Sequence, residues 1–95
     1  MRGDPTNPGT LAESDLASYR AVQREPLCGR YRGRTICGMG MPSSGTATML
    51  MTLALVEPFD LRALGVASAD AIHLIAEAQR LAYADRNRYM ADEAF

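Results

Sequence analysis

The chain has 95 residues, of which 47% are hydrophobic and 22% charged, and its formal net charge is −1 at pH 7. This length allows one small domain, which buries only a little over ~60% of its unfolded surface and is therefore marginal when it stands alone. The composition excludes a disordered chain, and the near-neutral charge excludes a dedicated nucleic-acid binder. No apolar stretch reaches the ~18 residues that a membrane span needs. All ten basic residues are arginine, so no mechanism that needs a lysine amine is available.

The first residues, 1–10, hold two Pro and two Gly and are typical of an exposed lead-in. They contain no apolar h-region, so no signal peptide is expected within this piece. A short helix is predicted at 11–20, where Thr10 and Glu13 have the spacing of a capping box. Three apolar residues share one side of that helix: Leu11, Leu16 and Tyr19.

A β-hairpin is predicted over residues 26–39, with Arg32 and Gly33 forming its two-residue turn. In such a hairpin Cys28 lies directly opposite Cys37, at a pair that is not hydrogen-bonded and whose side chains come closest. The turn alone therefore places the two cysteines within disulfide range. The alternative is a pair of buried free thiols, and the residues leave this choice open. An oxidising compartment would favour the disulfide.

Residues 38–46 form a turn-rich joint that leads from the hairpin into a helix predicted at 45–56. Ser43 or Ser44 is the natural N-cap of this helix. The helix ends before Pro58, because proline disfavours helical geometry at the residue that precedes it.

The longest helix is predicted at 69–90, with Ser68 as its N-cap, and the linker at 59–67 is expected to add a further helical turn. Apolar and small residues occupy two of its faces: Ile72, Ile75, Gln79 and Tyr83 on one, and Ala71, Leu74, Ala78, Leu81 and Ala82 on the other. A helix with two such faces is expected to lie between two partners. Together these elements predict an α+β chain.

The segment Gly40–Gly45 has the G-x-x-x-x-G spacing of a phosphate loop. Thr46 stands where that loop needs a lysine, so the segment is interpreted as a strand-to-helix joint instead. Near the end of the last helix, Asp85 and Arg88 have i,i+3 spacing, which favours an ion pair that orients the following loop.

The residue types of a serine hydrolase triad are present: Ser43, Ser44, His73 and Asp85. The G-x-S-x-G elbow is missing, and a lone histidine in an apolar helix is usually a packed residue. A thiol protease built on His73 and Cys28 or Cys37 lacks a local signature. Two Cys and one His in no C-x-x-C or H-x-x-x-H spacing do not define a metal site. No catalytic, cofactor-binding or metal-binding residue is therefore assigned, and no cofactor is expected.

A series of short motifs runs through nearly the whole chain in an order and spacing that resemble the gamma-glutamyltranspeptidases. The motifs are Asn7-Pro-Gly, Asp15-Leu-Ala-x-Tyr19-Arg, Arg24-Glu-Pro-Leu, Tyr31-Arg-Gly33, Met41-Pro-Ser-Ser-Gly45, Glu57-Pro-Phe-Asp-Leu61, His73, Glu77-Ala78 and Tyr83-Ala-Asp-Arg86. Each one alone is weak, but the ordered set is highly specific.

The resemblance implies part of an Ntn-hydrolase, an αββα sandwich made as one precursor that cleaves itself into a large and a small subunit. The family transfers the γ-glutamyl group of glutathione and similar amides to an acceptor amine or to water, through an acyl-enzyme on an N-terminal threonine. The segments that match belong to the C-terminal part of the large subunit. The threonine and the oxyanion-hole glycines would lie downstream of this sequence, and the arginine that holds the substrate carboxylate would lie upstream.

The resemblance therefore predicts that the chain alone is inactive and that its partner is the remainder of the precursor, including the small subunit. A glutathione-like substrate is expected only in the complete enzyme, and no nucleic acid or membrane is expected as a partner. Bacterial members are usually exported, which implies a periplasmic or secreted location and favours the Cys28–Cys37 bond. The alternative is a non-catalytic helical interaction module derived from the family.

Two positions depart from the family pattern in the joint, since Met41 and Thr46 stand where the family usually shows Pro and a second Gly. Loss of that glycine is expected to alter how closely another backbone can approach. The family also has a substrate-contacting Ser-Ser pair, but it belongs to the small subunit, so that role is not transferred to Ser43 and Ser44.

Overall fold

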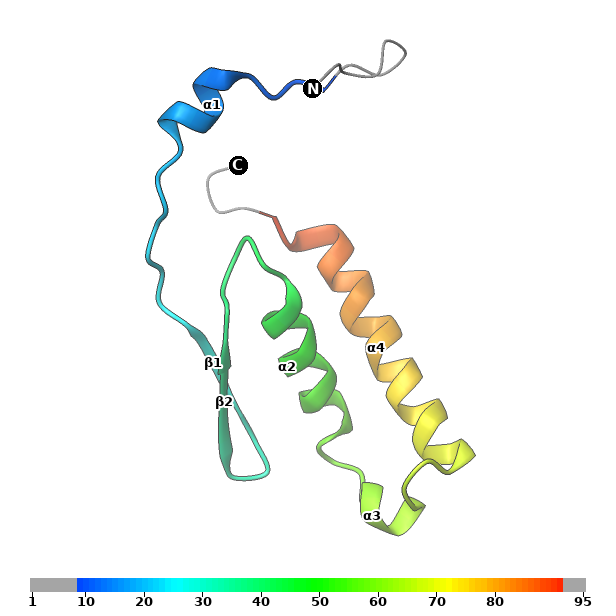
Figure 1. Cartoon of the computed structure of the whole chain (residues 1–95). Coiled ribbons are helices and arrows are strands. Elements are labelled where there is room, and N and C mark those ends of the chain that lie inside the picture. The colour runs from blue at the N-terminus through cyan, green and yellow to red at the C-terminus, as the bar shows by residue number, and fades with distance from the viewer. Residues whose placement is uncertain (1–8, 92–95) are drawn as a thin grey trace.

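The computed structural model describes residues 9–91, so the predicted lead-in at 1–10 lies almost entirely outside the described residues. The elements follow one another in chain order, as Figure 1 shows: α1 (Glu13–Ser18), β1 (Leu27–Tyr31), β2 (Arg34–Gly38), α2 (Gly45–Val56), α3 (Leu61–Leu64) and α4 (Ala69–Tyr89). The α+β class, with one short helix, a hairpin and two longer helices, is confirmed.

Helix α1 is shorter than the predicted 11–20 and begins differently. The Asp15 carboxylate accepts a hydrogen bond from the Ala12 N–H over 2.8 Å, so the cap lies at Ala12 and not at Thr10. The helix has no buried residue, and Leu16 and Tyr19 are 78% and 72% exposed. In Figure 1 it stands apart from the other elements, beyond an extended segment. A short helix without tertiary packing is marginal, which explains why it spans only six residues.

The hairpin has the register that its turn predicts. Cys28 is paired with Cys37 across the antiparallel strands, their Cα atoms are 4.1 Å apart, and the two sulfurs form a disulfide. The choice left open by the sequence is thus decided in favour of the bond. Arg32 and Gly33 have φ angles of 48° and 77°, the positive values that a tight two-residue turn of this hand requires.

Helix α2 packs against one face of the hairpin, and α4 packs along the other side of α2 (Figure 1). Backbone and side chain approach closely here: a Cβ added to Gly29 would lie 2.8 Å from Leu50 Cδ2. The core is small, consisting of buried residues from both helices: Thr46, Thr48, Val56, Ala71, Ala78 and Ala82. No large side chain is fully buried among the described residues.

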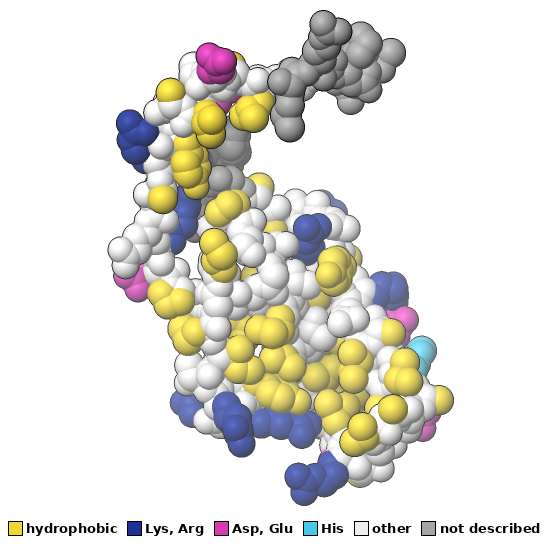
Figure 2. All heavy atoms as spheres, viewed as in Figure 1, with side chains coloured by type: hydrophobic (Ala, Val, Ile, Leu, Met, Phe, Trp, Pro, Cys, Tyr) yellow, Lys and Arg dark blue, Asp and Glu magenta, His cyan; other side chains and the backbone are white. Residues whose placement is uncertain are grey.

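The prediction that the longest helix is covered on two faces is met on one face only. On one predicted face Ala71, Ala78 and Ala82 are buried, although Leu81 at its edge is 51% exposed. On the other face Ile72 and Tyr83 are 57% and 51% exposed. Figure 2 shows hydrophobic side chains gathered over the region that the hairpin, α2 and α4 occupy in Figure 1. The described part of the chain thus presents an apolar surface that it does not cover itself.

The connections around α3 are held by side chains. Arg32 in the hairpin turn donates its backbone N–H to Glu57 Oε1 and its guanidinium to the Phe59 carbonyl, both over 2.7 Å. Asp60 caps α3 by accepting from two backbone N–H groups at 3.0 and 3.1 Å. Ser68 caps α4 as predicted, accepting from the Ala71 N–H over 3.1 Å.

Candidate functional site: a groove between the hairpin and the two long helices

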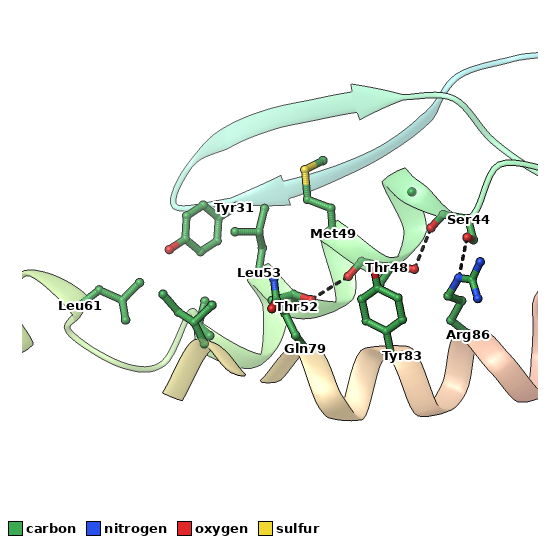
Figure 3. A pocket seen from close by; sticks show the side chains of 13 residues that line it. Tyr31, Ser44, Thr48, Met49, Thr52, Leu53, Leu61, Gln79, Tyr83 and Arg86 are labelled. Carbon is green, nitrogen blue, oxygen red and sulfur yellow. Dashed lines mark hydrogen bonds between the residues drawn. The ribbon is translucent and has the colours of Figure 1, made fainter. Parts of the chain in front are cut away.

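A groove of about 440 Å³ opens between the hairpin, α2, α3 and α4. Its walls are mostly apolar, with Thr52 and Gln79 near the middle, and Ser44 and Arg86 lie at the end where α2 begins and α4 ends (Figure 3). The apolar part includes Leu53, Val56, Leu61 and Ile75, and the polar part includes Ser44, Thr48, Tyr83 and Arg86. A groove of this character suits an apolar side chain or a short segment with one polar end.

The polar end is organised around Arg86. Its Nε donates a hydrogen bond to Ser44 Oγ over 2.9 Å, and its guanidinium lies 5.7 Å from the centre of the Tyr83 ring. A second guanidinium nitrogen donates to Asn87 Oδ1 over 2.8 Å. Figure 3 shows Ser44 and Arg86 pointing toward each other across the gap between α2 and α4.

Ser44 therefore does not act as the sequence predicts. It occupies the N-cap position of α2, but its backbone is helical (φ −81°, ψ −6°) and its hydroxyl makes no capping bond. Ser43 supplies no side-chain cap either. The nearest signal in the sequence was Tyr83-Ala-Asp-Arg86 itself, but nothing local shows that this arginine reaches a residue 42 positions earlier.

The two threonine hydroxyls of the groove are bonded to the helix backbone. Thr48 Oγ1 donates to the Ser44 carbonyl over 2.8 Å, and Thr52 Oγ1 donates to the Thr48 carbonyl over 2.9 Å. Among the described residues, no histidine or carboxylate lines the groove.

The residues whose types match a hydrolase triad, which were not assigned as catalytic from the sequence, are not brought together. Ser44 contacts Arg86, and His73 lies 13 residues earlier on α4, which at 1.5 Å per residue places it about 20 Å away along the helix axis. Both cysteines are in the disulfide, so neither is a thiol nucleophile. Within residues 9–91, no group of three His, Cys, Asp or Glu side chains is placed to hold a metal ion.

The predicted Asp85–Arg88 ion pair is not formed. Arg88 lies over the Tyr89 ring instead, 5.5 Å from its centre. The ion pair that does form on α4 is Glu77–Arg80, at 2.6 Å. The hydrogen bond and the charge of Arg80 lower the pKa of the Glu77 carboxyl below its ordinary value. Both residues are on the solvent side of the helix, away from the groove.

None of the helices in the described residues is both long enough and apolar enough to cross a membrane.

Comparison with known proteins shows the family to which the chain belongs. The family model described as gamma-glutamyltranspeptidase matches residues 3–95, so the chain belongs to that family. Among curated relatives, the glutathione hydrolase proenzyme of Escherichia coli (strain K12) is 44% identical over 89 residues, which cover 94% of this chain and 15% of that protein. The acylase ACY 1 proenzyme of Pseudomonas sp. (strain SE83) is 45% identical over 89 residues, covering 94% of this chain and 16% of that protein.

A solved structure is also similar. The crystal structure of Helicobacter pylori gamma-glutamyltranspeptidase superposes with a TM-score of 0.83 at 46% sequence identity, covering 92% of this chain and 25% of that chain. The chain thus corresponds to a small part of larger relatives, several of which are named as proenzymes.

Proposed function

We propose that the chain is part of a gamma-glutamyltransferase or glutathione hydrolase, which transfers the γ-glutamyl group of glutathione-like amides to an acceptor amine or to water. The observation that carries this proposal is the family match over residues 3–95, with relatives near 45% identity. The reaction would pass through an acyl-enzyme on a threonine outside this chain.

We further propose that the remainder of the precursor, including the small subunit, covers the groove and the open flanks of α4. The support is the exposure of large apolar side chains such as Ile72 and Leu81, together with a core in which no large residue of the described part of the chain is fully buried. A monomer rarely leaves such a patch open without a partner. We place the working protein in an oxidising compartment, periplasmic or extracellular, because the disulfide would persist there.

The test uses the proenzyme of Escherichia coli with its matching 89 residues replaced by those of this chain, a protein that we call the exchange proenzyme. We expect it to mature and to turn over a γ-glutamyl anilide, whereas the 95-residue chain alone should be inert. The unmodified Escherichia coli proenzyme is the positive control. Turnover by the 95-residue chain alone would contradict the proposal and would return attention to its own serines and histidine.

A second candidate is the hydrolysis of an amide that carries no γ-glutamyl group, because the acylase relative is as similar as the glutathione hydrolase. The protein from the complete reading frame that contains this sequence should be assayed with a γ-glutamyl anilide and with an acyl anilide that lacks the amino-acid carboxylate. Preference for the second would favour the acylase. A folded product that turns over neither would favour the non-catalytic interaction module.

A further inference from the structure

The two faces of the hairpin carry different residues. Gly29 lies on the face that packs against α2, where an added Cβ would strike a side chain of that helix (Figure 1). Because side chains alternate along a strand, Cys28 and Cys37 lie on the opposite face, together with Arg30 and Thr35. Each of these residues is exposed. A charged and a polar residue beside the cysteines are typical of a sheet face that meets solvent, so the disulfide is open to small solutes.

The shape of the hairpin does not depend on the disulfide. The two-residue turn has the positive φ angles that it requires, at Arg32 and Gly33. Arg32 also donates its backbone N–H to Glu57 Oε1 over 2.7 Å, which ties the turn to the end of α2. At the other end of the strands, Gly38 lies against Thr46 at the start of α2. The strands are thus held at both ends, and the two Sγ atoms stay opposite each other when the bond between them is open.

The charge around the disulfide is positive. Residues 26–39 include three arginines and no acidic residue. Arg30 follows Cys28 by two positions on the same face, which places it about 7 Å further along β1. A positive charge at this distance attracts an anionic reagent. Exposure of the sulfurs and attraction of the reagent both favour attack on the bond by a small anionic thiol.

We propose that the Cys28–Cys37 disulfide is a site of reversible exchange with small anionic thiols, and that the hairpin stays folded while the bond is open. A thiolate attacks one Sγ and forms a new sulfur–sulfur bond there. The electron pair of the broken bond leaves on the other Sγ, which takes up a proton. The proposal does not rest on the proposed function, since it concerns the hairpin alone.

The mixed disulfide formed in this way has two fates. The freed cysteine lies opposite it, so after losing its proton it can displace the small thiol and re-form the original bond. A second molecule of the small thiol can instead attack the mixed disulfide. Both cysteines are then reduced, and two molecules of the small thiol are oxidised to their own disulfide.

The test uses the oxidised, folded protein from the complete reading frame that contains this sequence. It is treated with 3-mercaptopropionate, an anionic thiol without a γ-glutamyl group, and quenched by alkylation before the masses of the peptides that carry Cys28 and Cys37 are measured. We expect a mixed disulfide on one cysteine and an alkyl group on the other. The bond should open no more than about tenfold slower than in the same protein unfolded in urea, because folding does not hide the sulfurs.

A second set of rates tests the charge. Cysteamine is the comparison reagent, because its thiolate form has no net charge, whereas that of 3-mercaptopropionate has two negative charges. Arg30→Gln should lower the ratio of the 3-mercaptopropionate rate to the cysteamine rate about threefold at low ionic strength. Arg34→Gln is the matched control: it removes the same charge from the face that carries Gly29, so it should change the ratio less.

Three results would overturn the proposal. The first is a folded protein whose disulfide opens more than about tenfold slower than in urea, which would show that the sulfurs are covered. The second is loss of the far-UV circular dichroism when the bond opens, or failure of the bond to re-form when the thiol is removed. The third is a rate ratio that Arg30→Gln leaves unchanged, which would remove the preference for anionic thiols. No readout uses turnover of a γ-glutamyl substrate, so a failure of the proposed function would be a separate result.

Discussion

Thr46 stands where the family usually shows a second glycine, and its side chain is buried against the end of β2. A Cβ on Gly38 would overlap Thr46 Oγ1 and would come within 3.2 Å of its Cγ2. The end of β2 and the start of α2 can thus approach closely because residue 38, and not residue 46, is a glycine. The departure at position 46 changes which residue must be small, and it does not open a gap.

This arrangement predicts a compensating pair. Gly38→Ala in the exchange proenzyme should destabilise it by about 1–3 kcal/mol, the usual cost of overpacking, because the added methyl group meets a β-branched side chain on a helix. Adding Thr46→Gly should recover part of that loss, since it removes the side chain that the methyl group would strike. Melting temperatures of the parent, both single variants and the double variant check this. Additive losses in the double variant would show that the two residues do not contact each other.

Among the elements, those that local signals determine were predictable from the sequence. The Arg32-Gly33 turn set the pairing of Cys28 with Cys37, and Ser68 set the start of α4. What the sequence could not supply came from contacts between distant residues. Arg86 takes the Ser44 hydroxyl away from its helix, and α1 stays short because nothing packs against it.

The Glu77–Arg80 pair makes α4 itself sensitive to pH. Glu77 accepts two hydrogen bonds from the Arg80 guanidinium, and this bond, the charge of Arg80 and, to a smaller degree, His73 lower the pKa of the carboxyl below its ordinary 4.5. Because the pKa is lower in the helix than in the unfolded chain, the pair stabilises the helix above pH 4.5. That contribution is lost as the pH falls through the lowered pKa.

A synthetic peptide of residues 69–89 tests this, since it is long enough to form some helix by itself. Its helicity, followed by circular dichroism from pH 7 to pH 2, should fall more than that of the Glu77→Gln peptide. Other titrating residues are present in both peptides, so the difference between them isolates Glu77. The Arg80→Gln peptide should likewise lose less helicity than the parent peptide as the pH falls. Superimposable curves for the parent and Glu77→Gln would show that the pair is not formed in the helix.

At the scale of the whole molecule, the chain has more apolar surface than it can bury. Within residues 9–91 its core consists of alanines, threonines and one valine, while Ile72 and Leu81 lie on opposite flanks of α4 and are more than half exposed. Side chains of this size are usually covered, and the relatives are several times longer than this chain. The fold is therefore best described as one part of a larger packing unit.

Replacing an apolar residue on each flank of α4 by glutamate should affect the 95-residue chain and the exchange proenzyme in opposite ways. Ile72→Glu with Leu81→Glu should reduce self-association of the 95-residue chain, because it replaces the exposed apolar surface by charge. The same double change should lower the yield of folded exchange proenzyme, where these residues are expected to be buried. Ala84→Glu, on the face that carries Glu77 and Arg80, is the control and should do neither. Sedimentation and soluble yield are the measurements, and an undisturbed exchange proenzyme would mean that these flanks stay open.

The two cysteines lie only nine positions apart, which has a consequence in time. A hairpin closes within ~1–10 μs, whereas a chain grows at only ~5–20 residues per second. The hairpin can therefore form while the residues of α4 have yet to be synthesised, and its sulfurs meet without help from any later element. Forming the bond itself takes seconds to hours and needs an oxidant, so the pairing of the strands, and not the cross-link, is the step that precedes α4. The hairpin wall of the groove can therefore take its shape before the helical wall exists.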